Sequence, residues 1–92
     1  MIFVRRVVGD SMMPVLNEGQ MIFAHQIRNF KEGQVVVAFV NGREVIKRII
    51  KIDNGSIYLQ GDNKDHSTDS RTYGPIPDRN VEGVVFWPKT SI

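Results

Sequence analysis

Two Asn-Gly pairs, Asn41-Gly42 and Asn54-Gly55, constrain the fold of this chain more than any other feature. The residues of such a pair readily adopt the positive φ angles that a two-residue type I′ hairpin turn requires. Both pairs lie between short stretches rich in Val, Ile and Phe, and no stretch keeps the apolar spacing of an amphipathic helix. The sequence therefore predicts a mostly β domain with antiparallel hairpins at its centre.

The apolar stretches predict six short strands. Gly, Asn, Asp and Pro separate them, which is typical of turns between strands. From residue 61 to residue 77 the chain is polar, so we expect a long loop there, and a long loop in so small a domain is usually functional. The expected strands are 2–8, 21–25, 34–40, 43–53, 56–60 and 81–87.

The composition limits the size and class of the protein. With 92 residues, of which 41% are hydrophobic and 24% charged, the chain can bury one core, so we expect residues 1–92 to form a single domain. The absence of cysteine excludes a disulfide scaffold, a thiolate zinc site and a thiol nucleophile. The net charge of +2 is not concentrated in any block, and nucleic acid is therefore not an expected partner.

The apolar runs are too short for a membrane-spanning segment. The longest run covers residues 35–40, whereas about 20 residues span a bilayer and about 7 to 15 form the core of a signal peptide. We therefore expect no transmembrane segment in this chain, while peripheral contact with a membrane stays open. The oligomeric state does not follow from the sequence.

The first hairpin places a lysine in apolar surroundings. A two-residue loop at 41–42 pairs Val40 with Arg43 and sets Lys47 opposite Val36. Side chains alternate along a strand, so the neighbours of Lys47 on its side are apolar, namely Val36, Ala38, Val40, Val45 and Ile49. The second hairpin, built around 54–55, would set Gln60 opposite Ile49 and start the long loop near Lys47.

Three segments carry chemistry when they are taken together: Gly9 to Pro14 (GDSMMP), Ile46 to Ile49 (IKRI) and Gly61 to Arg71 (GDNKDHSTDSR). A serine is a poor nucleophile unless a neighbouring group accepts its proton, and a neutral lysine can do this. Burial among apolar side chains disfavours the ammonium form and is expected to lower the pKa of Lys47. The alternative is that Lys47 reaches solvent or pairs with an acid such as Asp62.

In this order the three segments resemble the signature boxes of the type I signal peptidase (leader peptidase) family of Ser-Lys endopeptidases. That family has a Gly-x-Ser-Met-x-Pro box, a Lys-Arg box on a strand, and a Gly-Asp-Asn-x-x-x-Ser-x-Asp-Ser-Arg box. The segment from Glu32 to Phe39 (EGQVVVAF) also resembles the strand box that precedes the lysine, so the likeness spans about residues 4 to 85. The resemblance implies a small antiparallel β-sheet or partly open barrel.

The resemblance also implies a role for each matching residue. Ser11 would be the nucleophile, Lys47 the general base, and Ser67 the hydroxyl that holds the lysine amine. Asp69 and Arg71 would form a supporting salt bridge, which Arg48 would join. The residues by themselves are also compatible with a surface charge cluster of little energetic value.

The same resemblance indicates how a substrate would be held. The backbone N–H of Ser11 would be one oxyanion donor, while Gly9 lacks the side-chain donor that some members carry at that position. The family cuts after small residues, and by position Val7 and Ile46 would line the pocket for them, although both also suit ordinary core packing. The partner would be a preprotein or leader peptide bound as an extended strand.

The chain departs from the usual signal peptidase by its brevity. Only ten residues precede Ser11, and only residues 49–60 separate Arg48 from Gly61. It resembles the anchorless members, such as those that process the leader of nickel-type superoxide dismutase. We expect a cytoplasmic protein if the chain is complete, and a membrane-anchored enzyme with an extracytoplasmic active site if an anchor was removed.

No cofactor and no metal site are expected. His66 lies in the long loop without a set of neighbouring ligands, and His25 lies in a strand. The acidic loop also fails as a calcium site, because Ser70 and Ile76 stand where glycine and an acidic ligand are required.

Two rival functions share the same fold. One is the self-cleaving domain of LexA-type repressors, which also has a Ser-Lys dyad. It would need a DNA-binding helix-turn-helix and an Ala-Gly or Cys-Gly cleavage site upstream of the serine, neither of which this sequence contains. The other is a non-catalytic binding module, which predicts loss of Ser11 or Lys47. The sequence therefore favours a serine endopeptidase that removes N-terminal leader or signal peptides.

Overall fold

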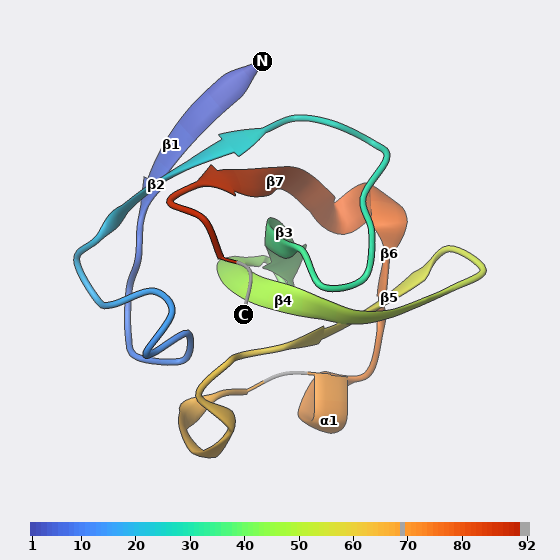
Figure 1. The fold of residues 1–92 in the computed structure, drawn as a ribbon. Helices are drawn as coiled ribbons and strands as arrows, with labels where there is room; N and C mark the ends of the chain where they lie inside the picture. The colour runs from blue at the N-terminus through green and yellow to red at the C-terminus, as the bar shows by residue number, and fades with distance from the viewer. Residues whose placement is uncertain (69, 91–92) are drawn as a thin grey trace.

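The computed structural model describes residues 1–68 and 70–90, and its described part is one curved antiparallel sheet (Figure 1). The order of the strands in the sheet is β1-β2-β7-β3-β4-β5-β6. Short helical turns lie at Lys64–His66, Ser70–Tyr73 (α1) and Asp78–Asn80. The strands are β1 Ile2–Arg6, β2 Met21–His25, β3 Val35–Val40, β4 Arg43–Asp53, β5 Ser56–Gln60, β6 Ile76–Pro77 and β7 Val81–Trp87.

The mostly β antiparallel fold expected from the sequence is confirmed, and β2, β4, β5 and β7 have the expected bounds. β1 ends two residues earlier than expected, at Arg6, because the chain turns away through Gly9 with a φ of +81°. The short strand β6 and the helical turns were not expected. β6 has only two residues, one of them Pro77, so it lacks the alternation by which a strand is recognised.

The first hairpin has the expected register. Asn41 and Gly42 have φ angles of +51° and +76°, and Val40 pairs with Arg43. As a result Lys47 lies opposite Val36, and its side chain is only 5% exposed. The apolar surroundings that the sequence predicts for this lysine are therefore present in the fold.

The second hairpin departs from the expected register. Asp53 pairs with Ser56 as a two-residue turn requires, but a bulge at Ile50 shifts the ladder, so that Gln60 lies opposite Arg48 and not opposite Ile49. The bulge changes which residues of β4 face the core. It brings Ile49 opposite Leu59, and both side chains are fully buried, while the extra residue Ile50 is exposed.

The core consists of two clusters that share β3. Val36, Ala38 and Val40 point into one cluster with side chains of β4, β5 and β7, and Val35 and Val37 point into the other. β3 is thus buried on both faces, as its run of apolar residues requires. The second cluster also contains Met12 and Leu16, which follow β1.

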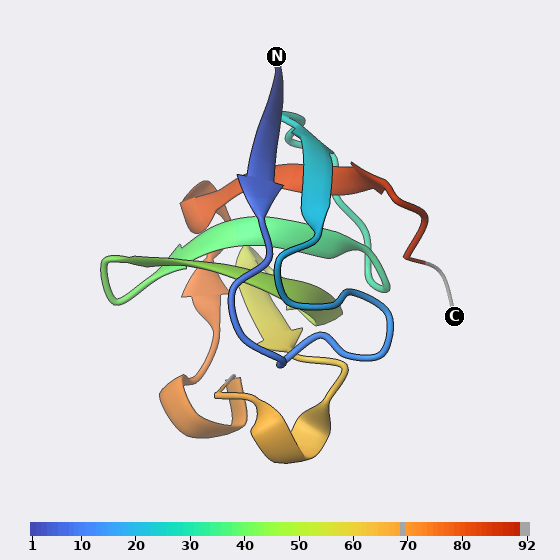
Figure 2. The ribbon, with the colours of Figure 1, turned by 90° about the vertical axis from the view of Figure 1, so that its left-hand side faces the viewer.

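The sheet is curved, so that β1 and β2 run across the direction of β7, β3 and β4 (Figure 2). This curvature brings the segment after β1 to the same end of the molecule as the segment after β5 (Figures 1 and 2). Among the described residues, no helix has the length and apolar character needed to cross a membrane.

Candidate active site

Lys47 lies on β4, an interior strand of the sheet. Its Nζ atom donates a hydrogen bond of 2.8 Å to the Oγ atom of Ser67, in the segment that follows β5. An amine that is nearly buried among apolar side chains needs such a polar partner. The structure therefore places Lys47 and Ser67 together, as the resemblance implies.

Ser11 lies in a tight turn after β1. The turn is anchored by Met12 and Leu16, which are 1% and 0% exposed, and the amide of Leu16 donates to the carbonyl oxygen of Met12 at 3.0 Å. Ser11 itself is only partly buried. The apolar anchors thus fix the backbone of the turn while its serine faces the cleft described below.

Gly61 brings the turn and the base together. A Cβ atom at this position would collide with the side chain of Ser67 and with the carbonyl oxygen of Ser11, so only glycine fits. Two residues later, the amide of Asn63 donates to the same Ser11 oxygen at 2.8 Å. The Gly-Asp-Asn segment is therefore the physical link between Ser11 and the Lys47–Ser67 pair.

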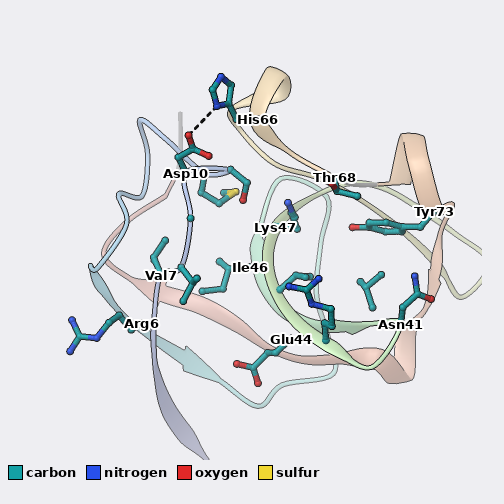
Figure 3. A pocket seen from close by; sticks show the side chains of 17 residues that line it. Arg6, Val7, Asp10, Asn41, Glu44, Ile46, Lys47, His66, Thr68 and Tyr73 are labelled. Atoms are coloured by element: carbon teal, nitrogen blue, oxygen red, sulfur yellow. Dashed lines mark hydrogen bonds and ion pairs between the residues drawn. The ribbon is translucent and has the colours of Figure 1, made fainter.

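A cleft of about 580 Å³ opens beside these residues (Figure 3). Ser11 and Lys47 both line it, and so do Val7 and Ile46, which lie side by side in Figure 3. Val7 is 4% exposed and Ile46 packs against the core cluster that contains it, so these two side chains serve the core as well as the cleft wall.

Arg48 makes contacts that the sequence did not predict. Among the described residues its ion-pair partner is Asp62, to which Nε and one terminal nitrogen donate at 2.8 and 2.7 Å. Its guanidinium also donates to the carbonyl oxygens of Gly33 and Thr90. Because Arg48 points to the opposite side of β4 from Lys47, it ties the long loop to the β2–β3 connection and to the end of the chain. Asp62, which the sequence offered as a possible partner of Lys47, thus forms an ion pair with Arg48.

The expected Asp69–Arg71 salt bridge lies outside the described residues, because Asp69 is not among them. Arg71 donates to the carbonyl oxygen of Lys64 at 2.9 Å and so braces the helical turn that precedes Ser67. This contact lies within the loop and does not involve Lys47.

The sequence did not predict two contacts between the long loop and Asp10, the residue that precedes Ser11. The Nδ1 atom of His66 lies 3.0 Å from the carboxylate of Asp10 (Figure 3). The side-chain amide of Asn63 donates to the carbonyl oxygen of Asp10 at 3.1 Å. The only sequence signal was that Asp10 and His66 each adjoin a residue of the proposed site. His25, by contrast, lies on β2 and stacks on Phe86 with a centroid separation of 4.0 Å.

A second polar cluster lies at the far end of the cleft. Arg5 of β1 donates to Glu44 of β4 at 2.6 Å and lies 3.8 Å from Glu82 of β7. Burial, a hydrogen bond to Glu44 and the charge of Glu44 raise the pKa of Glu82 to about 7. Burial opposes ionisation of Glu44 too, but the hydrogen bonds from Glu82 and Arg5 leave the pKa of Glu44 below its ordinary value.

No residues suited to holding a metal ion gather in the described part of the chain, where no three His, Cys, Asp or Glu side chains lie together. The polar groups that line the cleft include Ser11 and Lys47, and the Lys47 amine is bonded to the hydroxyl of Ser67. Such a set can move a proton from a hydroxyl to an amine, and acyl transfer to a serine requires this proton transfer.

Comparisons with known proteins identify a family and several relatives. A family model described as Peptidase S24-like matches residues 1–86. Mitochondrial inner membrane protease subunit 1 of Homo sapiens is 30% identical over 110 aligned positions, covering 87% of this chain and 66% of the human protein. The LexA repressor of Shewanella baltica (strain OS155) is 39% identical over 66 positions, covering 71% of this chain and 32% of the repressor. The chain thus spans just under two thirds of the first relative and about a third of the second.

Proposed function

The chain belongs to the Peptidase S24-like family, and on this premise we propose that it is a serine endopeptidase in which Ser11 is the nucleophile and Lys47 the general base. The observation that carries the proposal is the nearly buried Lys47 amine, bonded to Ser67 in the cleft that Ser11 also lines. A neutral lysine held in this way beside a serine can act as its base.

The reaction proceeds by acyl transfer. The Ser11 hydroxyl attacks the scissile carbonyl carbon and its proton passes to Nζ of Lys47, while the Ser67 hydroxyl orients the amine. Backbone N–H groups, that of Ser11 among them, stabilise the developing oxyanion. Lys47 then protonates the leaving amine, and the ester on Ser11 is hydrolysed by a water molecule that Lys47 deprotonates.

The substrate fits as an extended strand. Residues 43–47 of β4 pair with β3 on one edge, and β5 joins the other edge only from Arg48 onward, so this stretch has no strand partner on that side among the described residues. A peptide could pair there by its backbone. Val7 and Ile46 would leave room only for small side chains next to the cut.

The natural substrate is a preprotein whose leader peptide is removed after a small residue. One relative is a protease subunit of the mitochondrial inner membrane, and the three boxes of the chain resemble those of the type I signal peptidase family. The similarity to LexA repressors favours a second candidate, a domain that cuts its own chain. A third candidate is a module that binds a leader without cutting it.

Intact-mass analysis separates these candidates. The purified chain is incubated with a preprotein whose leader ends in a small-x-small sequence, and in parallel alone, with Ser11→Ala as the control. The proposal expects a single cut after the last small residue, which the control does not make. A mass loss in the chain incubated alone would point to self-cleavage instead. An uncut preprotein that nevertheless binds to the folded chain would point to the binding module.

A further inference from the structure

We propose that Asp10 and His66 form a clasp that holds the nucleophile turn in register with the base. The inference rests on the proposed function and deepens it, because it names two positioning residues of the same site. Neither side chain is required to touch the substrate or the reacting atoms. Their effect would be exerted through the position of Ser11.

The clasp joins two segments that are far apart in sequence. Asp10 directly precedes Ser11, and His66 directly precedes Ser67, whose hydroxyl receives the hydrogen bond from Lys47. The 3.0 Å contact between Asp10 and His66 thus connects the neighbour of the nucleophile to the neighbour of the residue that holds the base. Figure 3 shows this contact among the residues that line the cleft, which also include Lys47.

Asn63 completes the link on the backbone side. Its amide donates to the Ser11 carbonyl oxygen at 2.8 Å, its side chain donates to the Asp10 carbonyl oxygen at 3.1 Å, and its own carbonyl accepts from the amide of His66 at 3.0 Å. The loop therefore holds the turn by hydrogen bonds to the backbone of both Asp10 and Ser11. The clasp adds a contact between two side chains to these bonds.

The chemistry of the two side chains identifies the donor of the hydrogen bond between them. An ionised carboxylate only accepts hydrogen bonds, so Nδ1 of His66 is the donor to Asp10. The side chains of His66 and Asp10 are 60% and 47% exposed, and a pair so exposed adds little to stability. A misplacement of about 1 Å at a reacting group can nevertheless cost about a hundredfold in rate. The clasp should therefore affect kcat more than KM or folding.

Two matched substitutions of the histidine test the clasp. The amide nitrogen of asparagine occupies the place of Nδ1, whereas that of glutamine occupies the place of Nε2. We expect H66Q to lower kcat about tenfold with KM unchanged, and H66N to stay within about threefold of wild type. D10N, which still accepts the bond, should likewise be active, and D10A should resemble H66Q. D65N, at the exposed position next to His66, is the control.

The double variant D10A/H66Q distinguishes a clasp from two independent effects. If one bond is lost in either single variant, the double variant should be no slower than each single one. The proposal would be overturned if the losses in kcat multiplied in the double variant, or if H66N and H66Q lost kcat equally. A change confined to KM would overturn it as well. Unchanged denaturation midpoints in urea check that all variants fold.

A readout that needs no catalysis separates failure of the clasp from failure of the proposed function. Amide hydrogen exchange of Asn63 reports its bond to the Ser11 carbonyl oxygen. It should accelerate several-fold in H66Q and D10A but not in H66N. If the chain cuts no preprotein yet exchange follows this pattern, the clasp stands and the peptidase proposal falls. If exchange is the same in all variants while cleavage is lost only in Ser11→Ala, the peptidase proposal stands and the clasp falls.

Discussion

At the scale of single residues, the site depends on the amine of Lys47 and on the absence of a side chain at Gly61. Lys47 is nearly buried and donates a hydrogen bond to the Ser67 hydroxyl, and a Cβ atom on Gly61 would collide with both Ser67 and the backbone of Ser11. The register of the first hairpin, which the sequence predicts from Asn41-Gly42, is enough to place Lys47 among apolar neighbours. The contact at Gly61 could not be predicted, because it depends on two segments that meet only in the folded chain.

The substitution Lys47→Arg should abolish cleavage. Arginine keeps the positive charge and about the same length, but it does not lose its proton near neutral pH and so cannot act as a base. We expect a fall in kcat/KM of at least about a thousandfold in a peptide cleavage assay, with the fold retained by circular dichroism. Cleavage within tenfold of the wild-type rate would show that Lys47 is not the base.

The substitution Gly61→Ala should separate the turn from the base. The added Cβ atom would overlap the Ser67 side chain and the Ser11 carbonyl oxygen, so one of them must move. Overpacking of this kind costs about 1 to 3 kcal/mol in unfolding free energy. We expect such a loss in urea denaturation together with a fall in kcat of more than tenfold. A fully active, equally stable variant would contradict the close packing described here.

At the scale of elements, the loop after β5 is positioned from both faces of β4. Lys47 reaches it from one face through Ser67, and Arg48 reaches it from the other through Asp62. The resemblance to signal peptidases predicted a supporting role for Arg48 but associated it with Asp69 and Arg71. The actual partner follows from the alternation of side chains along the strand, which turns Arg48 toward Asp62, and Gln60 lies opposite Arg48 because of the bulge at Ile50.

The substitution Arg48→Met should destabilise the protein strongly. The Arg48 and Asp62 side chains are 9% and 11% exposed, and removal of one partner leaves the other charge buried without compensation. We expect a loss of about 3 kcal/mol in unfolding free energy, measured by urea denaturation at neutral pH. The double variant Arg48→Met/Asp62→Leu should recover part of this loss, whereas equal stability of wild type and Arg48→Met would exclude a structural role for the pair.

At the scale of the whole molecule, distant parts of the sheet are joined by Arg5, Glu44 and Glu82, of which Glu44 also lines the cleft. These residues belong to β1, β4 and β7, which are not neighbours in the sheet. Burial, the hydrogen bond to Glu44 and the charge of Glu44 raise the pKa of Glu82 to about 7, although the charge of Arg5 opposes this rise. A local sequence pattern contains no sign of this cluster.

The cluster makes stability depend on pH in a defined direction. Because the pKa of Glu82 is raised to about 7, the folded state holds a proton that the unfolded state has released above its own lower pKa. Stability therefore falls as pH rises from about 5 to 7 and then levels off. The lowered pKa of Glu44 affects stability only at more acidic pH.

The substitution Glu82→Gln should remove this loss of stability. Glutamine resembles the protonated carboxyl group, so the variant should gain about 1 to 2 kcal/mol relative to wild type at pH 8 and little at pH 5. Urea denaturation at the two pH values measures the difference. An equal effect at both would mean that Glu82 does not titrate in this range.

The sequence by itself determined the antiparallel hairpins, the bounds of most strands and the apolar setting of Lys47, because turn chemistry and side-chain alternation act between residues close in the chain. Tertiary structure alone decided the bulge at Ile50, the partners of Arg48 and the contact of Asp10 with His66. These features depend on how the curved sheet brings distant segments together and on which side chains then fill the core. No spacing within a strand or turn encodes such contacts, so they became visible only in the fold.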